Sequence, residues 1–221
     1  MNGAGSQSDA PVLVCFALKE EAKHFNPATN REGIKVLITG IGKKNTEATF
    51  RVARESVKPR LVVTCGYAGG LDPALPLSAI VFDADAETGF APGLLKLGAK
   101  PVRFFCGERI AATAAEKKAL RESTGADAVE MESSVIRQIC REQKIPSATI
   151  RVISDIALED MPLDFNQLTT SDLRLDYLKL TGKVLAHPGK IPGLIRFGKQ
   201  TAAAAKELGR VLSKLLLDHR G

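Results

Sequence analysis

The sequence lacks the features that mark membrane-spanning, exported and metal-binding proteins. None of its apolar runs approaches the roughly 20 residues that a membrane-spanning helix needs. The first ten residues, MNGAGSQSDA, show no basic-then-apolar signal pattern, so we expect a flexible N-terminus over residues 1–10 and a cytoplasmic protein. The cysteines have no CxxC spacing and no histidine nearby, which predicts free buried thiols in a reducing compartment and no metal site. They are Cys15, Cys65, Cys106 and Cys140.

The chain also lacks a charge excess outside its C-terminal tail. The net charge is +6, from 31 basic and 25 acidic residues. Residues 173–221 hold ten of the basic and three of the acidic residues, so the tail carries the whole excess and the body is close to neutral. A basic tail would suit nucleic acid, but its only aromatic residues are Tyr177 and Phe197, and it contains no recognition motif. We therefore expect no nucleic-acid partner.

What is present is the composition of a globular α/β protein. With 44% hydrophobic and 25% charged residues, the chain is neither disordered nor a coiled coil. Short apolar runs alternate with helical stretches, which predicts a three-layer α/β fold: a mixed, mostly parallel sheet flanked by helices. Residues 11–221 are expected to form a single domain. The predicted strands are 11–16, 34–39, 61–65, 79–83, 102–106 and 148–154, the predicted helices are 45–57, 111–122 and one ending at Glu142, and 88–101 is predicted as a loop.

The C-terminal tail carries its own pattern. From about residue 194 to 217, apolar residues recur at helical spacing and basic residues fall largely on the other side, which predicts a basic amphipathic helix. A Pro- and Gly-rich linker, residues 187–193, precedes it. The apolar face could pack on the sheet, or the helix could lie at an anionic membrane surface as a peripheral contact. The sequence leaves both possibilities open.

Four polar groups follow the apolar strands. They are Glu21, the glycine cluster at 66–70, Glu130 with Glu132, and Asp155. In parallel α/β sheets the chemistry sits at the carboxyl ends of the strands, and carboxylates placed there are costly unless solvated, paired or used. Taken singly, Glu21 could be a first-turn helix carboxylate and Asp155 an N-cap.

The glycine motifs give little support for NAD binding or for ATP hydrolysis. Gly40-Ile41-Gly42 lacks the third glycine of the dinucleotide fingerprint, because Asn45 stands in its place. Gly69-Gly70 lacks the Lys-Ser or Lys-Thr that follows in a phosphate-gripping P-loop. We therefore predict no cofactor.

Five segments occur in a specific order along residues 11–157. They read ALKEE at 17–21, TGIGKKN at 39–45, GYAGGLDP at 66–73, VEME at 129–132 and RVISDIA at 151–157. Together they resemble the signature segments of the purine nucleoside phosphorylase/nucleosidase family. The most similar branch is the methylthioadenosine/S-adenosylhomocysteine nucleosidase type, which implies a nucleoside phosphorylase-like fold and an enzyme that cleaves N-glycosidic bonds.

The roles implied by this resemblance agree with the chemistry of the bond. Cleavage builds positive charge on the ribose and negative charge on the leaving base, so an acid must meet the purine and a nucleophile must attack the anomeric carbon. The resemblance implies that Asp155 protonates the purine at N7 and that Ser154 orients it. It also implies that Glu21, with Glu130 nearby, positions the attacking water.

The resemblance assigns further residues to substrate binding. Glu132 would bind the ribose hydroxyls, with Met131 packing on the sugar. The remaining substrate-binding residues implied are Tyr67, Gly69, Ile110 and Ala111. Tyr67 stands where these nucleosidases usually have serine, and Ile110 stands where they usually have an aromatic residue that stacks on the purine.

The choice of nucleophile can be argued from charge. Phosphorolytic members hold phosphate with arginines, and no arginine occurs between Val12 and Asn30. A glutamate at position 21 would repel phosphate but would act as a base toward water, which favours hydrolysis. Lys19, Lys43 and Lys44 keep a phosphate-dependent phosphorylase as an alternative. A non-catalytic nucleoside-binding protein is a further alternative, because Tyr67 and Ile110 alter the pocket.

Two departures from the family point to an unusual substrate. The segment between Gly70 and Gly107 is much shorter than in nucleosidases, where it helps cover the 5′ side of the substrate and shape the dimer contact. This implies an open 5′ side and a bulky 5′ substituent, in a protein expected to be a homodimer. Residues 182–198 are similar to the C-terminus of hopanoid-associated phosphorylase-like nucleosidases, which implies an adenosylhopane-like substrate.

Overall fold

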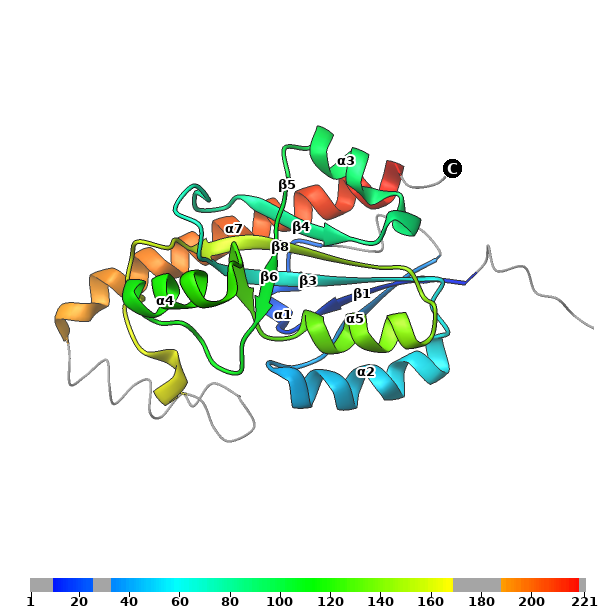
Figure 1. The fold of residues 1–221 in the computed structure, drawn as a ribbon, viewed down its shortest axis with the longest axis horizontal. Helices are drawn as coiled ribbons and strands as arrows, with labels where there is room; N and C mark the ends of the chain where they lie inside the picture. Colours follow the sequence, from blue (N-terminus) through cyan, green and yellow to red (C-terminus); the bar gives the residue numbers. More distant parts are fainter. Residues whose placement is uncertain (1–9, 26–32, 169–187, 219–221) are drawn as a thin grey trace, which may run out of the picture.

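The structure is a computed structural model that describes residues 10–25, 33–168 and 188–218. An eight-stranded mixed sheet lies between two layers of helices (Figure 1). The strands are β1 (Val12–Phe16), β2 (Ile34–Ile38), β3 (Leu61–Gly70), β4 (Ile80–Ala84), β5 (Lys100–Pro101), β6 (Phe104–Cys106), β7 (Ala128–Glu130) and β8 (Ser147–Asp155). The helices are α1 (Lys19–Ala22), α2 (Lys43–Val57), α3 (Phe90–Lys96), α4 (Ala114–Thr124), α5 (Ser133–Glu142) and α7 (Ile191–Asp218). All but the last residue of the predicted flexible N-terminus, and residues 182–187 of the tail, lie outside the described residues.

The predicted mixed, mostly parallel sheet is confirmed. The strand order is β2-β1-β3-β8-β4-β5, and β7 joins β3 to β6. Strands β2, β1, β3 and β8 are parallel to one another, whereas β4 runs antiparallel to β8 and β7 antiparallel to β3. The carboxyl ends of these four parallel strands therefore meet at one edge, which is where the polar motifs follow their strands.

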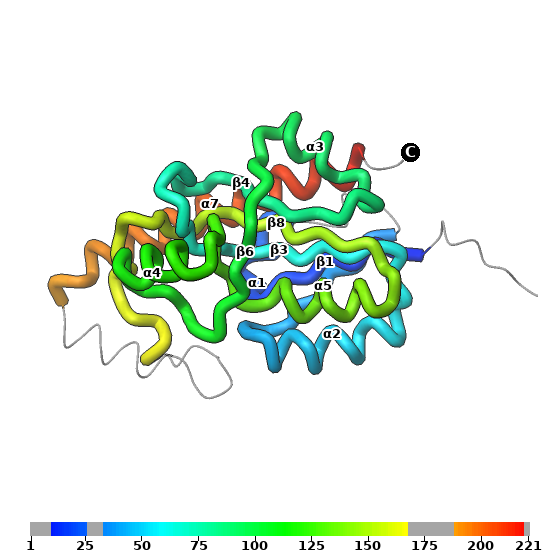
Figure 2. The backbone as a smooth tube through the Cα atoms, in the orientation of Figure 1, coloured from blue at the N-terminus to red at the C-terminus, as the bar shows by residue number. Residues whose placement is uncertain are grey.

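Alternation along the strands builds the two apolar layers. Val14 and Phe16 of β1 face the side covered by α7 and α3, while Leu13 and Cys15 face the side covered by α2 and α5. Figure 2 shows the two pairs of helices on opposite sides of the sheet. Three of the cysteines are buried free thiols, as predicted, and Cys106 is partly exposed. Helices thus cover both faces of the sheet, which leaves the ends of the strands as the place where polar side chains can gather.

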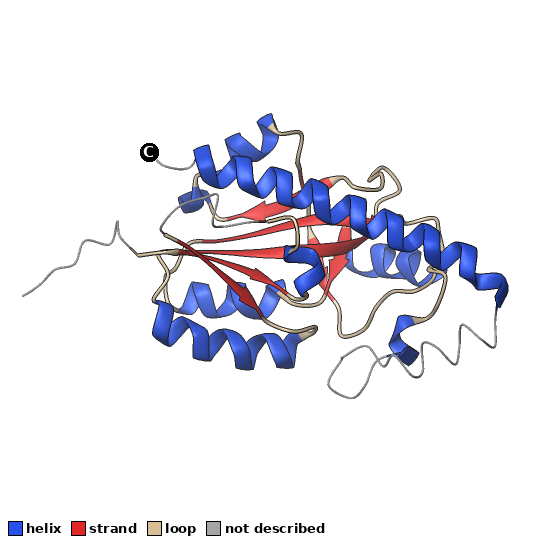
Figure 3. Cartoon of the chain, turned by 180° about the vertical axis from the view of Figure 1, so that it is seen from behind, coloured by secondary structure: helices blue, strands red, loops and turns tan. Residues whose placement is uncertain are grey.

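The long C-terminal helix α7 packs along one face of the sheet (Figure 3). Its second half is buried through Leu208, Leu212 and Leu215, which belong to the same apolar cluster as the strands. Its first turns are mostly exposed, with Ile195 56% accessible. No helix in the described part of the chain is long and apolar enough to cross a membrane.

Two segments differ from the sequence predictions. Strand β3 does not stop at residue 65 but continues through the glycine cluster to Gly70, because it keeps pairing with β8 and then with β7. The predicted loop at 88–101 contains α3 and β5. Phe90 and Leu94 bury completely against the core, and a proline in the first turn of a helix costs no hydrogen bond.

Candidate active site

The carboxyl edge of the sheet brings the predicted acidic residues onto neighbouring elements. Glu21 lies in α1 immediately after β1, Glu130 ends β7, Glu132 follows it, and Asp155 is the last residue of β8. The glycine-rich half of β3 runs between them. Residue 66 of this strand pairs with residue 151 and residue 69 pairs with Asp155, so about 10 Å of strand separates two polar clusters.

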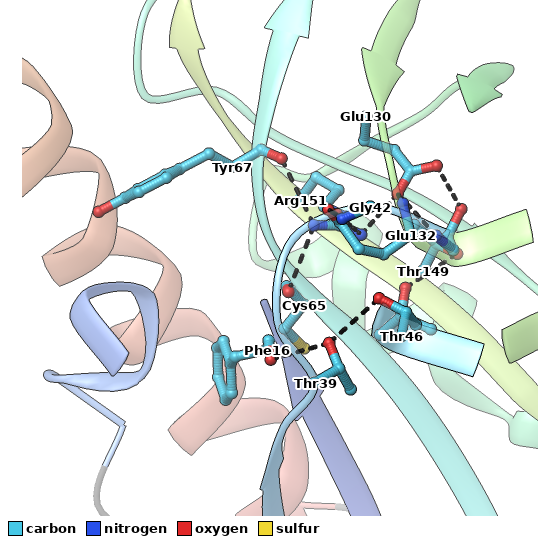
Figure 4. Close-up of polar contacts among 12 residues, drawn as sticks. Phe16, Thr39, Gly42, Thr46, Cys65, Tyr67, Glu130, Glu132, Thr149 and Arg151 are labelled. Atoms are coloured by element: carbon cyan, nitrogen blue, oxygen red, sulfur yellow. Dashed lines mark hydrogen bonds and ion pairs between the residues drawn. The ribbon is translucent and has the colours of Figure 1, made fainter. Parts of the chain in front are cut away.

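Arg151 is the centre of the first cluster. Its side chain is fully buried in β8, and Nη2 lies 2.6 Å from Glu130 Oε2 and 3.3 Å from Glu132 Oε2 (Figure 4). Nη1 donates to the carbonyls of Cys65 and Tyr67 at 3.4 and 3.5 Å. Although burial alone would lower it, the pKa of Arg151 is raised by these carboxylates, so the guanidinium stays charged. One buried cation therefore holds two carboxylates in fixed positions.

The two carboxylates of the VEME segment have further partners. Glu130 Oε2 accepts the Ser133 amide at 2.7 Å, and Oε1 accepts the Ser133 hydroxyl at 2.8 Å. Glu132 Oε1 accepts the Gly42 amide at 2.9 Å, which ties it to the loop before α2. Burial raises the pKa of Glu132 to about 7, against the lowering effect of Arg151 and with the support of the charge on Glu130. The buried Glu132 carboxyl therefore takes up a proton more readily than an exposed glutamate does.

Glu21 is held against the glycine strand. Its Oε1 accepts the Tyr67 amide at 2.9 Å and its Oε2 accepts the Leu18 amide at 2.8 Å. A Cβ on Gly66 would fall 2.5 Å from Glu21 Oε1 and 2.6 Å from Arg151 Nη1, so only glycine allows this approach. Burial raises the pKa of Glu21, and Arg151 and the backbone amides oppose this rise. A buried carboxylate of raised pKa is suited to take a proton from water.

The second cluster surrounds Asp155. Ser154 Oγ donates to Asp155 Oδ1 at 2.8 Å, and the ammonium of Lys117 lies 2.6 Å from Oδ2. A Cβ on Gly69 would stand 3.1 Å from the same Oδ2, so this glycine keeps the carboxylate close to β3. Asp155 is therefore an ion-paired carboxylate and not an N-cap of a helix.

The remaining predicted substrate-binding residues lie around these clusters. Met131 and Ala111 are buried, and Asn166 pins the neighbouring Ile110 by accepting its amide and donating to its carbonyl, both at 2.9 Å. Among the described residues, neither the amide nor the carbonyl of Ala111 has a hydrogen-bond partner. The Tyr67 ring points away from the carboxylates toward α7 (Figure 4), where its hydroxyl donates to the Thr201 carbonyl at 3.2 Å.

A cavity of about 160 Å³ opens beside Asp155. It lies between the loop that follows β8 and the first turns of α7, with Met161, Pro162 and Phe197 among its apolar lining and Arg196 among its polar lining. The Phe197 ring packs on Phe165 at 5.5 Å between centroids. The Asp155 carboxylate therefore lies at the boundary between the sheet edge and this cavity.

Two residues with central positions received no role from the sequence. Arg151 was visible as a single charge inside an apolar strand, four residues before Asp155. Lys117 lies three residues before Leu120, on the inner face of α4, and is the only fully buried residue of that helix. A charged residue at a buried position of a strand or helix is the signal that identifies both.

The comparisons with known proteins bear first on the fold. Residues 95–174 match the family profile described as the Phosphorylase superfamily. Among solved structures, the 5′-methylthioadenosine/S-adenosylhomocysteine nucleosidase of Campylobacter jejuni superposes with a TM-score of 0.71 at 15% identity, covering 95% of this chain and 99% of that one. The native futalosine hydrolase of Helicobacter pylori superposes with a TM-score of 0.69 at 15% identity, covering 96% and 100%. The predicted nucleoside phosphorylase-like fold is confirmed.

One protein that matches by sequence is also a nucleosidase. The 5′-methylthioadenosine/S-adenosylhomocysteine nucleosidase of Glaesserella parasuis is 27% identical over 178 residues, which cover 66% of this chain and 77% of that protein. Together these matches confirm the resemblance to the purine nucleoside phosphorylase/nucleosidase family. The narrower resemblance to the hopanoid-associated branch stays a prediction.

Proposed function

We propose that the protein is a nucleosidase that hydrolyses the N-glycosidic bond of an adenosine-type nucleoside. Its enzyme class, an N-glycosidase, is the class of the nucleosidases that it resembles. The observation that carries the proposal is the arrangement of two polar clusters along β3. Glu21, Glu132 and Arg151 lie at one cluster and Asp155 at the other, with glycines at the points of closest approach.

The Asp155 cluster supports binding of the purine. Ser154 and the surrounding strands hold the Asp155 carboxylate where it can share a proton with a ring nitrogen. The amide and carbonyl of Ala111, which have no partner among the described residues, offer a donor beside an acceptor, which complements the N1 and N6 edge of adenine. Because both backbone groups belong to a buried residue, a bound base would satisfy them.

The Arg151 cluster supports binding of the sugar and activation of water. Glu132 is placed to accept ribose hydroxyls, with Met131 packing beside it, and the buried Glu21 is placed to take a proton from water. The negative charge of these carboxylates also favours the positive charge that develops on the ribose. Glu130 would act through Arg151, since its oxygens are occupied by that residue and Ser133.

The same cluster disfavours a phosphorylase. Three buried carboxylates surround the single guanidinium of Arg151, so an incoming phosphate would meet an acidic site. Of the three lysines that kept the alternative open, Lys19 and Lys44 are exposed and Lys43 is partly buried. Water is the nucleophile that this charge arrangement accepts.

The catalytic roles are tested by release of adenine from 5′-methylthioadenosine. We expect Asp155→Asn and Glu21→Gln each to lower the rate by about 10²–10⁴-fold, the usual contribution of a general acid or base. Asp218→Asn, at the exposed end of α7, is the matched control and should leave the rate unchanged. Full activity of Asp155→Asn would overturn the role given to Asp155.

A finer proposal concerns the 5′ substituent. We propose that it is bulky and apolar, as in adenosylhopane, because the chain between Gly70 and Gly107, which helps cover the 5′ side of the substrate in the nucleosidases that it resembles, is short. Adenosines carrying 5′-alkyl chains of increasing length would then gain in kcat/KM over 5′-methylthioadenosine. A steady loss with chain length would contradict the proposal.

Two further proposals concern partners. A homodimer follows from the family resemblance and is tested by analytical ultracentrifugation. A contact with an anionic membrane surface would have to use the first turns of α7, where Ile191 and Ile195 are exposed, since the second half of the helix is buried. Co-sedimentation with phosphatidylserine vesicles, lost in Ile195→Glu, would support it, and failure to sediment would exclude it.

A further inference from the structure

Lys117 is a fully buried lysine whose hydrogen bonds are all made. Its side chain, in α4, has no exposed surface. The ammonium group lies 2.6 Å from Asp155 Oδ2 and donates to the carbonyls of Ile156 at 2.8 Å and Glu159 at 3.1 Å. These three acceptors match its three N–H bonds. Because a buried charge is costly unless it is paired and hydrogen-bonded, this is a built site and not an incidental contact.

The ion pair changes how the purine could be protonated. Both oxygens of Asp155 already accept from a donor, Oδ1 from Ser154 Oγ at 2.8 Å and Oδ2 from Lys117 Nζ at 2.6 Å, so neither oxygen can hold a proton of its own toward these donors. The leaving purine nevertheless needs one, because its N7 becomes basic as the glycosidic bond breaks. We propose that Lys117, and not a neutral Asp155 carboxyl, holds the proton that leaves with the purine. This inference rests on the proposed nucleosidase function.

The proton transfer balances as follows. The electron pair of the C1′–N9 bond moves onto the purine while water attacks C1′ and gives its proton to Glu21. A proton moves from Lys117 Nζ to Asp155 Oδ2 and from that oxygen to N7, which leaves Lys117 as a neutral amine and Asp155 as a carboxylate. After the products leave, Glu21 returns its proton to solvent, and Lys117 regains one from solvent through Asp155, whose side chain is 13% exposed.

The surroundings of Lys117 suit an amine that changes protonation state. Once it is neutral, the amine still has two N–H bonds for the Ile156 and Glu159 carbonyls and a lone pair facing Asp155. Arginine could form the same ion pair, but its guanidinium does not release a proton in proteins. A lysine is therefore required for proton transfer, whereas either cation would serve if Lys117 only oriented Asp155.

The experiment compares two leaving groups in Lys117→Met and Lys117→Arg. Adenine release from 5′-methylthioadenosine needs a proton on the base, whereas p-nitrophenyl β-D-ribofuranoside loses a phenolate that needs none. We expect both variants to lose about 100-fold or more in adenine release while p-nitrophenol release stays within about threefold of wild type. Lys118→Met, the neighbouring exposed position, is the control and should keep both activities.

The outcomes separate the inference from the function on which it rests. Adenine release that survives in Lys117→Arg would overturn proton storage and leave Lys117 as an electrostatic positioning residue. Equal loss of both activities in Lys117→Arg, with an unchanged melting temperature, would also overturn it. If the wild-type protein releases no adenine from adenosine derivatives, the proposed function fails, whatever the variants do.

Discussion

At the residue scale, the acidic cluster around Arg151 is held together by one cation and several amides. The carboxylate of Glu132 has the Gly42 amide and Arg151 as partners, yet burial still raises its pKa to about 7. Desolvation therefore outweighs the attraction of a shared guanidinium. Carboxyl groups whose pKa is raised by burial are common where acid–base chemistry takes place.

The raised pKa of Glu132 predicts how stability depends on pH. Between its usual value of 4.5 and about 7, the folded protein binds more protons at this residue than the unfolded chain does. The free energy of unfolding should therefore fall as pH rises through this window, by up to about 1.4 kcal/mol per pH unit for one proton. Urea unfolding at pH 5, 6, 7 and 8 measures this slope.

The matched variant for this prediction is Glu132→Gln. Removing the titrating group should flatten the slope between pH 5 and 7, and the part that remains would come from Glu21, whose pKa is also raised by burial. Glu122→Gln, an exposed position on α4, should leave the wild-type slope unchanged. An identical slope in wild type and Glu132→Gln would show that Glu132 titrates normally.

At the element scale, the packing of α7 joins the C-terminal part of the chain to the sheet. Gly209 is the point of closest approach: a Cβ there would stand 2.5 Å from the His24 carbonyl oxygen, which follows α1. Gly198 lies in the same helix, with no atom within 4 Å of such a Cβ. The two glycines therefore differ in packing but share a helical backbone.

The alanine variants of these glycines test the packing of α7. We expect Gly209→Ala to destabilise the protein by about 1–3 kcal/mol, because backbone atoms must move. Gly198→Ala should instead stabilise the helix by about 0.5–1 kcal/mol, since alanine is the better helix former. Chemical denaturation measures both values. Similar effects of the two substitutions would mean that α7 does not pack on His24.

Most elements could be predicted from the sequence because their signals are local. Alternation and apolar runs located five strands within a few residues, and β6 begins two residues after its predicted start. The continuation of β3 through Gly70 could not be predicted, since it depends on pairing with β8 and β7. Helix α3 was hidden by its Gly and Pro content, although Phe90 and Leu94 bury against α7.

The candidate site, too, could be predicted only where the signal is local in sequence. Motif order placed Glu21, Glu132 and Asp155 at one sheet edge, but the pairing of Asp155 with Lys117 depends on how α4 packs against the strand end. The direction of the Tyr67 side chain likewise depends on α7, which carries its acceptor. Contacts between elements far apart in sequence leave no local pattern to read.

At the scale of the whole molecule, charge is divided between a tail and a site. The net charge of +6 comes from residues 173–221, whereas the strand ends gather Glu21, Glu130 and Glu132 around a single arginine. A basic protein can therefore gather acidic side chains at its candidate site, and their charge disfavours the binding of phosphate. This arrangement is the physical reason for expecting water as the nucleophile.

The most direct test of this account is product analysis with 5′-methylthioadenosine in buffers with and without phosphate. We predict that adenine is released at the same rate in both and that the second product is always the free 5-methylthioribose. A rate that requires phosphate, with the sugar recovered as its 1-phosphate, would contradict hydrolysis and the role of Glu21 as the base.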